Sequence, residues 1–341
     1  MAIEIIGTGK YVPPRRVTND ELALERALDT SDEWIRSHTG IGARHIADDD
    51  MACSYLAIEA SREALAMAEP GLSLEQAALT LDLIVLATVT GDYFGCPSTA
   101  CIVQDKLGAK KAAAMDILAG CTGFIYAMET AAALLEASPD RKRALVIGSE
   151  VLCKFADWSD RGSCVLFGDG AGAAIIEKTA PSNGAGEKRG LLRTAIYADG
   201  SGAEVLFIKG GGSKELFKNG QTLEKSIHVV INGQAVYNFA VKVLVETVNE
   251  LLAREGITMN DLALIIPHQA NARIVQAAAK RLKVPEEKFY LNIEEYANTS
   301  AATIPIAMDE LNRAGKLKRG DLIMTVGFGA GLTYGGNIIR W

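Results

Sequence analysis

Asp82-Leu-Ile-Val85 opens a pattern that the chain carries twice. The first copy continues through Asp116-Ile-Leu-Ala-Gly-Cys121 to Ala144-Leu-Val-Ile-Gly148. The second runs from Asp261-Leu-Ala-Leu264 through Leu291-Asn-Ile293 and Asn298-Thr-Ser-Ala-Ala302 to Leu322-Ile-Met-Thr-Val-Gly327. Equivalent positions lie 177 to 179 residues apart (82 and 261, 121 and 298, 148 and 327). Because packed copies of one unit bring equivalent turns together, we expect the reactive side chains where the two copies meet.

Apolar strand-like runs such as Leu83–Thr88 alternate with amphipathic helical stretches such as Gly233–Glu255. This alternation favours mostly parallel sheets covered by helices. With the duplication, it predicts an α/β protein layered α/β/α/β/α, with an N-terminal half at residues 1–178 and a C-terminal half at 179–341. The stretch 123–137 has too little polar surface for an exposed helix, so we expect it between the sheets. The segment 181–225, rich in glycine and polar residues, predicts a surface excursion between the halves.

Composition narrows the function classes. The chain has 341 residues, of which 49% are hydrophobic, and a net charge of −7. That charge argues against a general nucleic-acid binder. The most apolar window contains Asp116 and Glu129, so we expect no membrane span and a cytosolic protein. Without a secretory signal, the six cysteines are interpreted as reduced thiols, and their spacing indicates no metal site.

Cys121 lies in Ala119-Gly-Cys-Thr-Gly123, a glycine-flanked join between a strand and a helix. A thiol at a helix N-terminus is stabilised as the thiolate by the helix dipole, which makes it a better nucleophile. The sequence therefore predicts a nucleophilic Cys121. The alternative is a packed core cysteine, as we expect for the other five.

Two further side chains follow strand-like runs in the second copy. His268 comes directly after Leu264-Ile-Ile-Pro267, at the strand end where parallel sheets carry their sites. Asn298 is assigned by the repeat to the position equivalent to Cys121. The alternatives are a structural histidine and an ordinary helix-capping asparagine.

Taken together, these motifs resemble the thiolase superfamily and, within it, the β-ketoacyl-acyl-carrier-protein synthase III family. The resemblance covers the whole chain and rests on Thr30-Ser-Asp-Glu-Trp-Ile35, Ala119-Gly-Cys-Thr-Gly-Phe124, Asp160-Arg-Gly-Ser163, Phe167-Gly-Asp-Gly-Ala-Gly-Ala173, Pro267-His-Gln-Ala-Asn271, Asn298-Thr-Ser-Ala-Ala302 and Gly327-Phe-Gly-Ala-Gly-Leu-Thr-Tyr-Gly335. The last turn lacks the second cysteine of thiolases. One histidine with Asn298, in place of the two histidines of elongating synthases, also favours the type III family.

The resemblance implies a decarboxylating condensation that starts fatty-acid synthesis. Cys121 would take an acyl group from coenzyme A (CoA), and its backbone N–H with that of Ala330 would bind the oxyanion. His268 and Asn298 would then donate hydrogen bonds to the enolate formed from malonyl-acyl carrier protein. Neither a metal nor a redox cofactor is needed. Phe328 would shield the cysteine from water or simply pack.

The resemblance also implies a CoA site. Trp34 would stack on the adenine, and Arg161 would hold the nucleotide end. Asn271 would orient the pantetheine or a water molecule. His38 stands where the family usually has an arginine, which leaves the strength of the CoA contacts open.

Two other features concern substrate choice. Cys96 stands where many relatives carry a phenylalanine that crosses a dimer interface and closes the acyl pocket, so the resemblance implies a homodimer and a primer not confined to acetyl. Tyr93 or Phe94 is the alternative filler of that space. Arg273, Lys280 and Arg281 share one helical face, which either docks the acidic carrier protein or is simply solvated.

Three other functions use parts of the same pattern. A starter or acyl-CoA condensing enzyme of secondary metabolism, or an ester-forming transferase, would use the same acyl-cysteine. A catalytically silent relative would serve as a scaffold, although Cys121, His268 and Asn298 are all present. A cysteine hydrolase would pass the acyl group to water.

Overall fold

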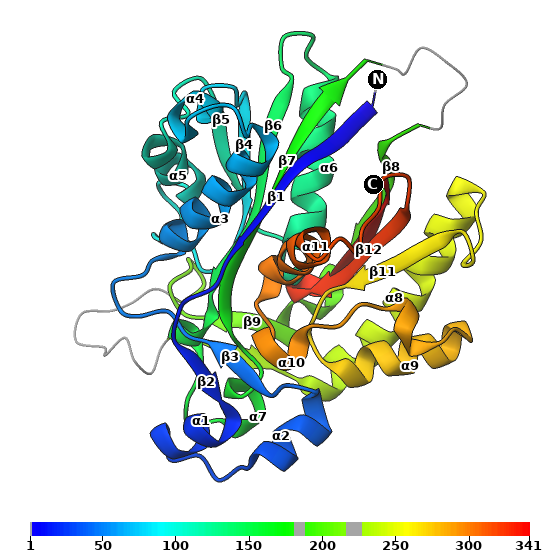
Figure 1. Ribbon diagram of the computed structural model, residues 1–341. Coiled ribbons are helices and arrows are strands. Elements are labelled where there is room, and N and C mark those ends of the chain that lie inside the picture. The colour runs from blue at the N-terminus through cyan, green and yellow to red at the C-terminus, as the bar shows by residue number, and fades with distance from the viewer. Residues whose placement is uncertain (1, 181–187, 216–226) are drawn as a thin grey trace.

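The computed structural model describes residues 2–180, 188–215 and 227–341, and it contains two large sheets with helices outside and between them (Figure 1). The first sheet has the order β1-β7-β6-β4-β5, and the second has the order β11-β12-β13-β8. Their strands are β1 Ala2–Tyr11, β4 Leu83–Ala87, β5 Ala113–Ile117, β6 Arg143–Val151, β7 Asp169–Thr179, β8 Gly190–Ala198, β11 Leu262–Pro267, β12 Leu322–Gly329 and β13 Thr333–Arg340.

The two sheets have the same topology, which confirms the duplication. In chain order, β1, β4, β5, β6 and β7 form the first sheet, and β8, β11, β12 and β13 repeat that order in the second. Phe289 forms an isolated parallel bridge with Ile265 of β11, at the place that β5 occupies beside β4 in the first sheet. In the second copy, this single bridge thus occupies the place of the fifth strand.

Helices form three layers around the sheets, as the layered α/β/α/β/α prediction requires (Figure 1). One pair covers the outer face of the first sheet, a second pair covers the second sheet, and a third pair lies between the sheets. These pairs are α3 Cys53–Ala68 with α5 Thr99–Leu107, α8 Gly233–Glu255 with α9 Ala272–Leu282, and α6 Gly123–Glu136 with α11 Thr303–Arg313.

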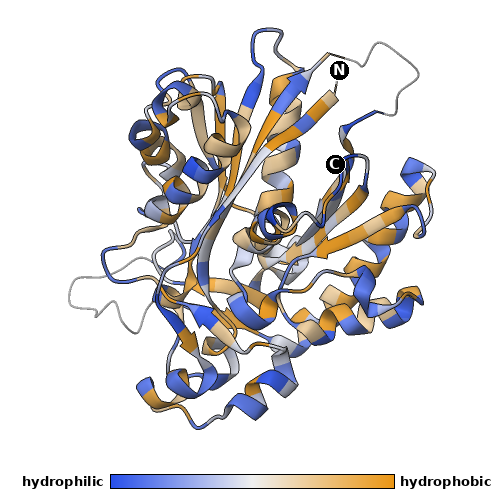
Figure 2. Ribbon diagram, viewed as in Figure 1, coloured by the Kyte–Doolittle hydropathy of each residue, from blue (hydrophilic) through white to orange (hydrophobic). Residues whose placement is uncertain are grey.

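The central layer ties the halves together. Phe124 and Ile125 of α6 and Ile304 of α11 are buried in one apolar cluster with Ile323 of the second sheet and Val146 of the first. Helix α11 also packs on β1 and β7 of the other half. Figure 2 shows the apolar colour concentrated along the strands and the polar colour on outward faces. The division at residues 178 and 179 stays a prediction, although β7 ends at Thr179 and β8 begins at Gly190.

The expectation of mostly parallel sheets is wrong. Pairs β4–β5, β4–β6 and β11–β12 are parallel, but β1–β7, β6–β7, β12–β13 and β8–β13 are antiparallel. The reason is the length of the connections. Only the three residues Ala330–Leu332 join β12 to β13, and a parallel crossover needs a dozen residues or more.

The surface excursion predicted at residues 181–225 is also partly wrong. It contains β8, which pairs with β13 inside the second sheet, and β9 Leu206–Lys209, which pairs with β10 His228–Ile231. The glycine-rich residues on both sides of β8 indicated a surface loop and masked the apolar pattern of the strand. Residues 181–187 and 216–226 lie outside the described part of the chain.

Smaller elements surround the lower part of the molecule in Figure 1. They are β2 Arg16–Thr18, β3 Ala43–His45, α1 Asn19–Glu25, α2 Asp32–Thr39, α7 Arg161–Cys164 and α10 Ile293–Tyr296, with α4 Leu74–Ala78 near the top. Within the described residues, the helices are too short or too polar to cross a membrane.

Candidate active site

Cys121 lies in a tight turn, η1 Gly120–Thr122, between β5 and α6. Gly120 has φ +55, and a Cβ added there would lie 2.6 Å from the backbone nitrogen of Ala330. A Cβ added at Gly329 would lie 2.5 Å from the backbone nitrogen of Cys121. Only glycines allow the two turns to touch, so the backbone N–H groups of Cys121 and Ala330 lie at one place, as an oxyanion-binding pair requires.

The environment of Cys121 contradicts the prediction of a stabilised thiolate. Burial raises the pKa of the Cys121 thiol to about 12, and hydrogen bonding to the Ser300 side chain lowers it by less. Cys121 lies in η1, which leads directly into α6 at Gly123, so burial outweighs the helix dipole at this N-terminus. The thiol therefore carries its proton at neutral pH, and attack on a substrate requires a group that accepts that proton.

The second turn, η6 Ser300–Ala302, precedes α11 as η1 precedes α6. The repeat places the two turns 180 residues apart, so Ala301 and not Asn298 is equivalent to Cys121, which corrects the sequence alignment. Ser300 takes the place of Gly120 and shares its positive φ, at +48. Asn298 lies three residues before Ala301, beside the turn.

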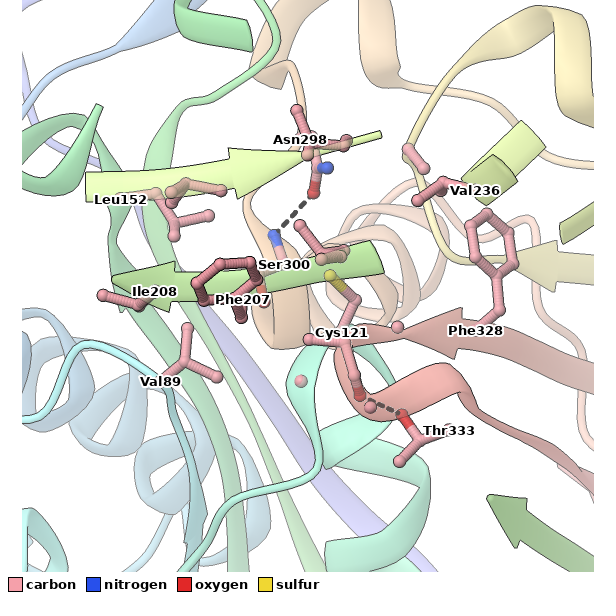
Figure 3. A pocket seen from close by; sticks show the side chains of 18 of the residues that line it. Val89, Cys121, Leu152, Phe207, Ile208, Val236, Asn298, Ser300, Phe328 and Thr333 are labelled. Atoms are coloured by element: carbon pink, nitrogen blue, oxygen red, sulfur yellow. Dashed lines mark hydrogen bonds between the residues drawn. The ribbon is translucent and has the colours of Figure 1, made fainter. Parts of the chain in front are cut away.

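Asn298 has a fixed orientation. Its backbone N–H donates to the carbonyl of Leu166, and its side-chain Oδ1 accepts from the Ser300 N–H at 2.8 Å. The side-chain oxygen is therefore occupied, and the Nδ2 amino group is left to face the cavity, where no described residue accepts from it. Figure 3 shows Asn298 and Ser300 joined in this way beside the sulfur of Cys121.

His268 follows β11 and is 1% exposed. Burial lowers its pKa to about 3, so the imidazole is neutral. Its Nδ1 lies 2.8 Å from Oγ1 of Thr303, which also lies 2.9 Å from the carbonyl oxygen of Ser300. Phe328 of β12 packs edge-to-face on the imidazole, with ring centroids 5.3 Å apart. The packing role is thus observed for Phe328; shielding of Cys121 stays a prediction.

A cavity of about 610 Å³ brings the predicted site residues together. Its lining includes Cys121, His268, Asn298, Phe328 and Ala330. On one side of the sulfur the wall is apolar, and Figure 3 shows the side chains that form it, namely Val89, Leu152, Phe207 and Ile208. An outer pocket shares Gly233, Tyr237 and Asn271 with the cavity and extends to His38 and Arg273, so a path leads from the surface to the cysteine.

Sequence reasoning missed Ser300, Thr303 and Glu150. The Ser300 hydroxyl donates to Oε1 of Glu150 at 2.9 Å, and Glu150 is fully buried. Burial raises the pKa of Glu150 to about 7. One signal was present, because Glu150 is an acid at the end of the apolar run Leu145-Val-Ile-Gly-Ser-Glu150.

The predicted CoA residues lie together at the outer end of the path. The Trp34 ring stacks on His38 at 4.4 Å, and the Arg161 guanidinium lies 5.1 Å from its centroid. An adenine would therefore have to join or displace one of these partners. Asn271 caps α9 by accepting from the Arg273 N–H, and its Nδ2 donates to the His38 carbonyl. Both of its polar side-chain atoms already have protein partners.

The remaining candidates lie on the surface. Cys96 is exposed and does not line the cavity within this chain, whereas Phe94 does. Arg273, Lys280 and Arg281 of α9 are all exposed, and Arg273 borders the outer pocket. The described residues include no cluster of three or more histidine, cysteine or acidic side chains suited to a metal ion.

Comparisons with known proteins agree with this geometry. The family model 3-oxoacyl-[acyl-carrier-protein (ACP)] synthase III matches residues 115–200, and its C-terminal model matches residues 252–341. A β-ketoacyl-[acyl-carrier-protein] synthase III of Clostridium perfringens is 49% identical over 337 residues, which cover 99% of this chain and 98% of that protein.

Two solved structures have the same fold. A 3-oxoacyl-[acyl-carrier-protein] synthase III from Aquifex aeolicus VF5 is 42% identical, with a TM-score of 0.86 and full coverage of both chains. The priming β-ketosynthase of the R1128 polyketide biosynthetic pathway is 32% identical, with a TM-score of 0.88 over 99% of this chain and 96% of that one.

Proposed function

The chain belongs to the 3-oxoacyl-[acyl-carrier-protein] synthase III family, and from that membership we propose that it condenses an acyl-CoA primer with malonyl-acyl carrier protein. The products are a 3-ketoacyl-acyl carrier protein, CoA and carbon dioxide, and the reaction initiates fatty-acid synthesis. The observation that carries the proposal is the convergence of Cys121, His268 and Asn298 on one cavity with a path to the surface.

In the first half-reaction, the Cys121 sulfur attacks the acyl-CoA thioester carbonyl. The N–H groups of Cys121 and Ala330 hydrogen-bond the oxyanion that forms, and one such donor is worth about 10²–10³ in rate. Collapse of the adduct breaks the bond to the CoA sulfur and leaves an acyl-Cys121 thioester. The covalent intermediate divides one difficult step into two easier ones.

In the second half-reaction, the malonyl thioester occupies the place of CoA. Its terminal carboxylate leaves as carbon dioxide, and the electron pair of the broken bond forms an enolate on the thioester. His268 Nε2 and Asn298 Nδ2 donate hydrogen bonds to the enolate oxygen. The carbanion then attacks the acyl-Cys121 carbonyl and releases Cys121 as a thiolate, which takes up one proton from solvent to restore the thiol.

This role defines the tautomer of His268. A donor at Nε2 requires an unprotonated Nδ1, so the Thr303 hydroxyl must donate to Nδ1 in the working enzyme. Thr303 has one hydroxyl proton and two acceptors in reach, Nδ1 and the Ser300 carbonyl. A neutral imidazole suits this role, and the lowered pKa of His268 keeps it neutral over the whole physiological range.

A direct test follows the product by mass spectrometry after the chain is mixed with acyl-CoA and malonyl-acyl carrier protein. We expect 3-ketoacyl-acyl carrier protein, with one CoA and one carbon dioxide for each product. Release of free fatty acid from acyl-CoA alone, with no ketoacyl product, would instead indicate the hydrolase.

The apolar wall beside Cys121 supports a primer that is not confined to acetyl. Val89, Leu152, Phe207 and Ile208 leave room for a longer or branched acyl chain. By resemblance to the family, Cys96 of a second copy would stand at the interface where many relatives carry a phenylalanine. Phe94 limits this space because it lines the same cavity. A panel of acyl-CoAs tests the preference: acetyl-CoA turnover far above that of butyryl- and isobutyryl-CoA would contradict it.

The outer pocket supports entry of the pantetheine arm past Asn271, with Trp34, His38 and Arg161 at the nucleotide end. The exposed basic face of α9, formed by Arg273, Lys280 and Arg281, supports docking of the acidic carrier protein beside the same entrance.

A homodimer accords with the surface around β5. This strand is the edge of the first sheet, and Leu118 directly after it is 81% exposed. Tyr93 and Phe94 are 60% and 63% exposed. Large apolar side chains beside an unprotected sheet edge favour pairing with another chain. Light scattering should give about twice the 36.3 kDa chain mass, and a monomer at micromolar concentration would contradict the assignment.

The two half-reactions balance without a metal or redox cofactor, so activity should survive a chelator. We assign the enzyme to the cytoplasm, where acyl-CoA and carrier-protein thioesters are made. The polyketide priming enzyme among the structural relatives favours one alternative, a starter synthase of secondary metabolism on the same chemistry. The two differ in the carrier protein they accept, so competition between fatty-acid and polyketide carrier proteins separates them.

A further inference from the structure

Glu150 is a carboxyl group buried in the wall of the active site. It lies on β6, is 0% exposed, and accepts hydrogen bonds from four groups. Oε2 accepts from Thr90 Oγ1 at 2.7 Å and Thr88 Oγ1 at 3.2 Å, Oε1 accepts from Ser300 Oγ at 2.9 Å, and the Val89 N–H lies 3.1 Å from Oε2. All four can donate to the ionised carboxylate, which offsets part of the cost of burying its charge.

Ser300 connects this carboxyl to the nucleophile. Its hydroxyl donates to Glu150 and also acts on the Cys121 thiol, and Figure 3 shows the sulfur directed toward Ser300. The residue holds φ +48, a left-handed conformation that costs a non-glycine residue about 1–2 kcal/mol. The Ser300 N–H donates to Asn298 Oδ1 at 2.8 Å, and this bond holds the residue in that conformation. This bond and the bond from the hydroxyl to Glu150 fix the position of the Ser300 hydroxyl.

The acyl transfer needs an acceptor for the Cys121 proton. His268 is unsuited, because its pKa is about 3 and its Nδ1 is engaged with Thr303. Burial raises the pKa of the Glu150 carboxyl to about 7, so its carboxylate is a stronger base than the buried imidazole of His268. The negative charge of Glu150 also raises the pKa of Cys121, which shows that the two groups are coupled.

We propose that Glu150, acting through the Ser300 hydroxyl, takes up the proton of Cys121 when the sulfur attacks the acyl-CoA thioester. The inference rests on the acyl transfer proposed above. Cys121 Sγ gives its proton to Ser300 Oγ, and Ser300 gives its own proton to Glu150 Oε1 as the carbon–sulfur bond forms. Ser300 faces the reacting sulfur (Figure 3), and Glu150 is a positioning residue that works through Ser300.

The proton returns by the same route. In the tetrahedral adduct both sulfurs are bonded to one carbon, so the Ser300 hydroxyl lies near the leaving sulfur as well. Glu150 gives its proton back through Ser300 as the carbon–sulfur bond to CoA breaks, and CoA leaves as the thiol. The carboxylate is then restored, and no other reactant is consumed.

Two other titratable groups lie close to Glu150. Cys121 faces it from η1, and Cys53 of α3 faces it through Thr88, whose hydroxyl lies 3.3 Å from the Cys53 sulfur. Asp92, in the loop after β4, acts on Cys53 in turn. Burial raises the pKa of Cys53 above the accessible range, so Cys53 keeps its proton and does not compete.

The test compares Glu150→Gln with the unaltered chain. Glutamine keeps the size of the side chain and an oxygen that accepts from Ser300, but it cannot take up a proton. Single-turnover formation of acyl-Cys121 should fall about 10²-fold at pH 7, the usual effect of a general base. In the unaltered chain this rate should rise through about pH 7 and level off. In Glu150→Gln that inflection should disappear, and the rate should keep rising toward the pKa of the thiol.

Ser300→Ala interrupts the same route and should give the same profile, which covers the case that Glu150→Gln does not fold. The matched control is Thr299→Val. Thr299 adjoins Ser300 and is 1% exposed, and its hydroxyl has no hydrogen-bond partner among the described residues. This control should keep both the rate and the inflection. An unchanged pH profile in folded Glu150→Gln or Ser300→Ala would overturn the proposal.

A second readout separates this inference from the proposed function. Alkylation of Cys121 by iodoacetamide, followed on the Cys121 peptide, uses no acyl-CoA. It should show the same dependence on pH and on Glu150. If Cys121 alkylation kept that dependence while no acyl-CoA acylated the chain, the proposed function would fail and the relay would stand. If acylation proceeded equally in Glu150→Gln, the relay would fail and the function would stand.

Discussion

The turns η1 and η6 have the same backbone and opposite tasks. Each precedes a helix of the buried central layer, and each begins with a residue at positive φ, Gly120 in one and Ser300 in the other. In η1 a side chain at that position would collide with Ala330, and the next residue is Cys121, the proposed nucleophile. In η6 the side chain is present and contacts Glu150. The duplication thus gave two turns with the same backbone, of which η1 carries the proposed nucleophile and η6 carries the hydrogen-bonding side chain beside it.

Removal of the proposed nucleophile from η1 should have the largest effect on activity. Cys121→Ala keeps both turns but should form no acyl adduct and no ketoacyl product. Decarboxylation of the malonyl thioester should continue, because His268 and Asn298 are untouched. Intact mass and carbon dioxide release measure the two outcomes. An acyl adduct on another residue of Cys121→Ala would mean that η1 is not the reactive turn.

Loss of either proposed enolate donor, His268 or Asn298, should leave the first half-reaction unchanged. His268→Ala and Asn298→Asp should acylate normally but lose about 10²–10³ in the condensation rate, the usual effect of one enolate donor. Aspartate keeps the oxygen that accepts from the Ser300 N–H, but it replaces the Nδ2 donor by a second oxygen and adds a negative charge that opposes the enolate. Single-turnover rates of each half-reaction give the comparison. Equal losses in both half-reactions would show that these residues serve structure rather than the enolate.

The first turn should tolerate no side chain at Gly120. Gly120→Ala adds left-handed strain of about 1–2 kcal/mol and a contact 2.6 Å from the Ala330 nitrogen. Gly108→Ala is the matched control, since Gly108 has φ +75 with nothing within 4 Å of the added Cβ. The free energy of unfolding should fall more for Gly120→Ala than for Gly108→Ala. Equal losses would remove the close approach of the two turns as the reason for the glycine.

The smallest effect concerns the outer helices α9 and α5, which the duplication relates. Arg273→Glu should raise the KM for malonyl-acyl carrier protein a few-fold and leave acyl-CoA loading intact, because an exposed ion pair is worth about 1 kcal/mol or less. The same charge change on α5, Lys106→Glu, should leave both steps unaltered. An equal effect of Arg273→Glu on loading would refute the docking role.

The sequence predicted much of the fold and of the candidate site, because the repeated pattern of strands and helices is visible in it. Helix α8 begins and ends at the expected residues, Gly233 and Glu255, and the three predicted site residues line one cavity at the junction of the copies. The sequence did not predict which strand pairs are antiparallel, because that depends on short connections such as the turn at Ala330–Leu332. The alignment of Asn298 with Cys121 failed for a related reason: the gap in the repeat becomes visible only when η1 and η6 are superposed on their helices.

Burial explains the other misses. The sequence placed Cys121 near a helix N-terminus and therefore predicted a thiolate, but desolvation outweighs the dipole in the folded protein. Glu150 ends an apolar strand, and nothing in its neighbours reveals that Ser300, distant by 150 residues, donates to it. Such contacts between the two copies are a property of the fold and not of either local sequence.

The central claim is that one sulfur carries the acyl group between two reactions at the junction of the copies. Its most direct measurement is the intact mass of the chain, first with acyl-CoA and then with malonyl-acyl carrier protein added. The account predicts one acyl group located on the Cys121 peptide, stable until malonyl-acyl carrier protein is added and then converted in equal amount to ketoacyl product. An adduct elsewhere, or its loss to water at the same rate without the malonyl substrate, would contradict the account.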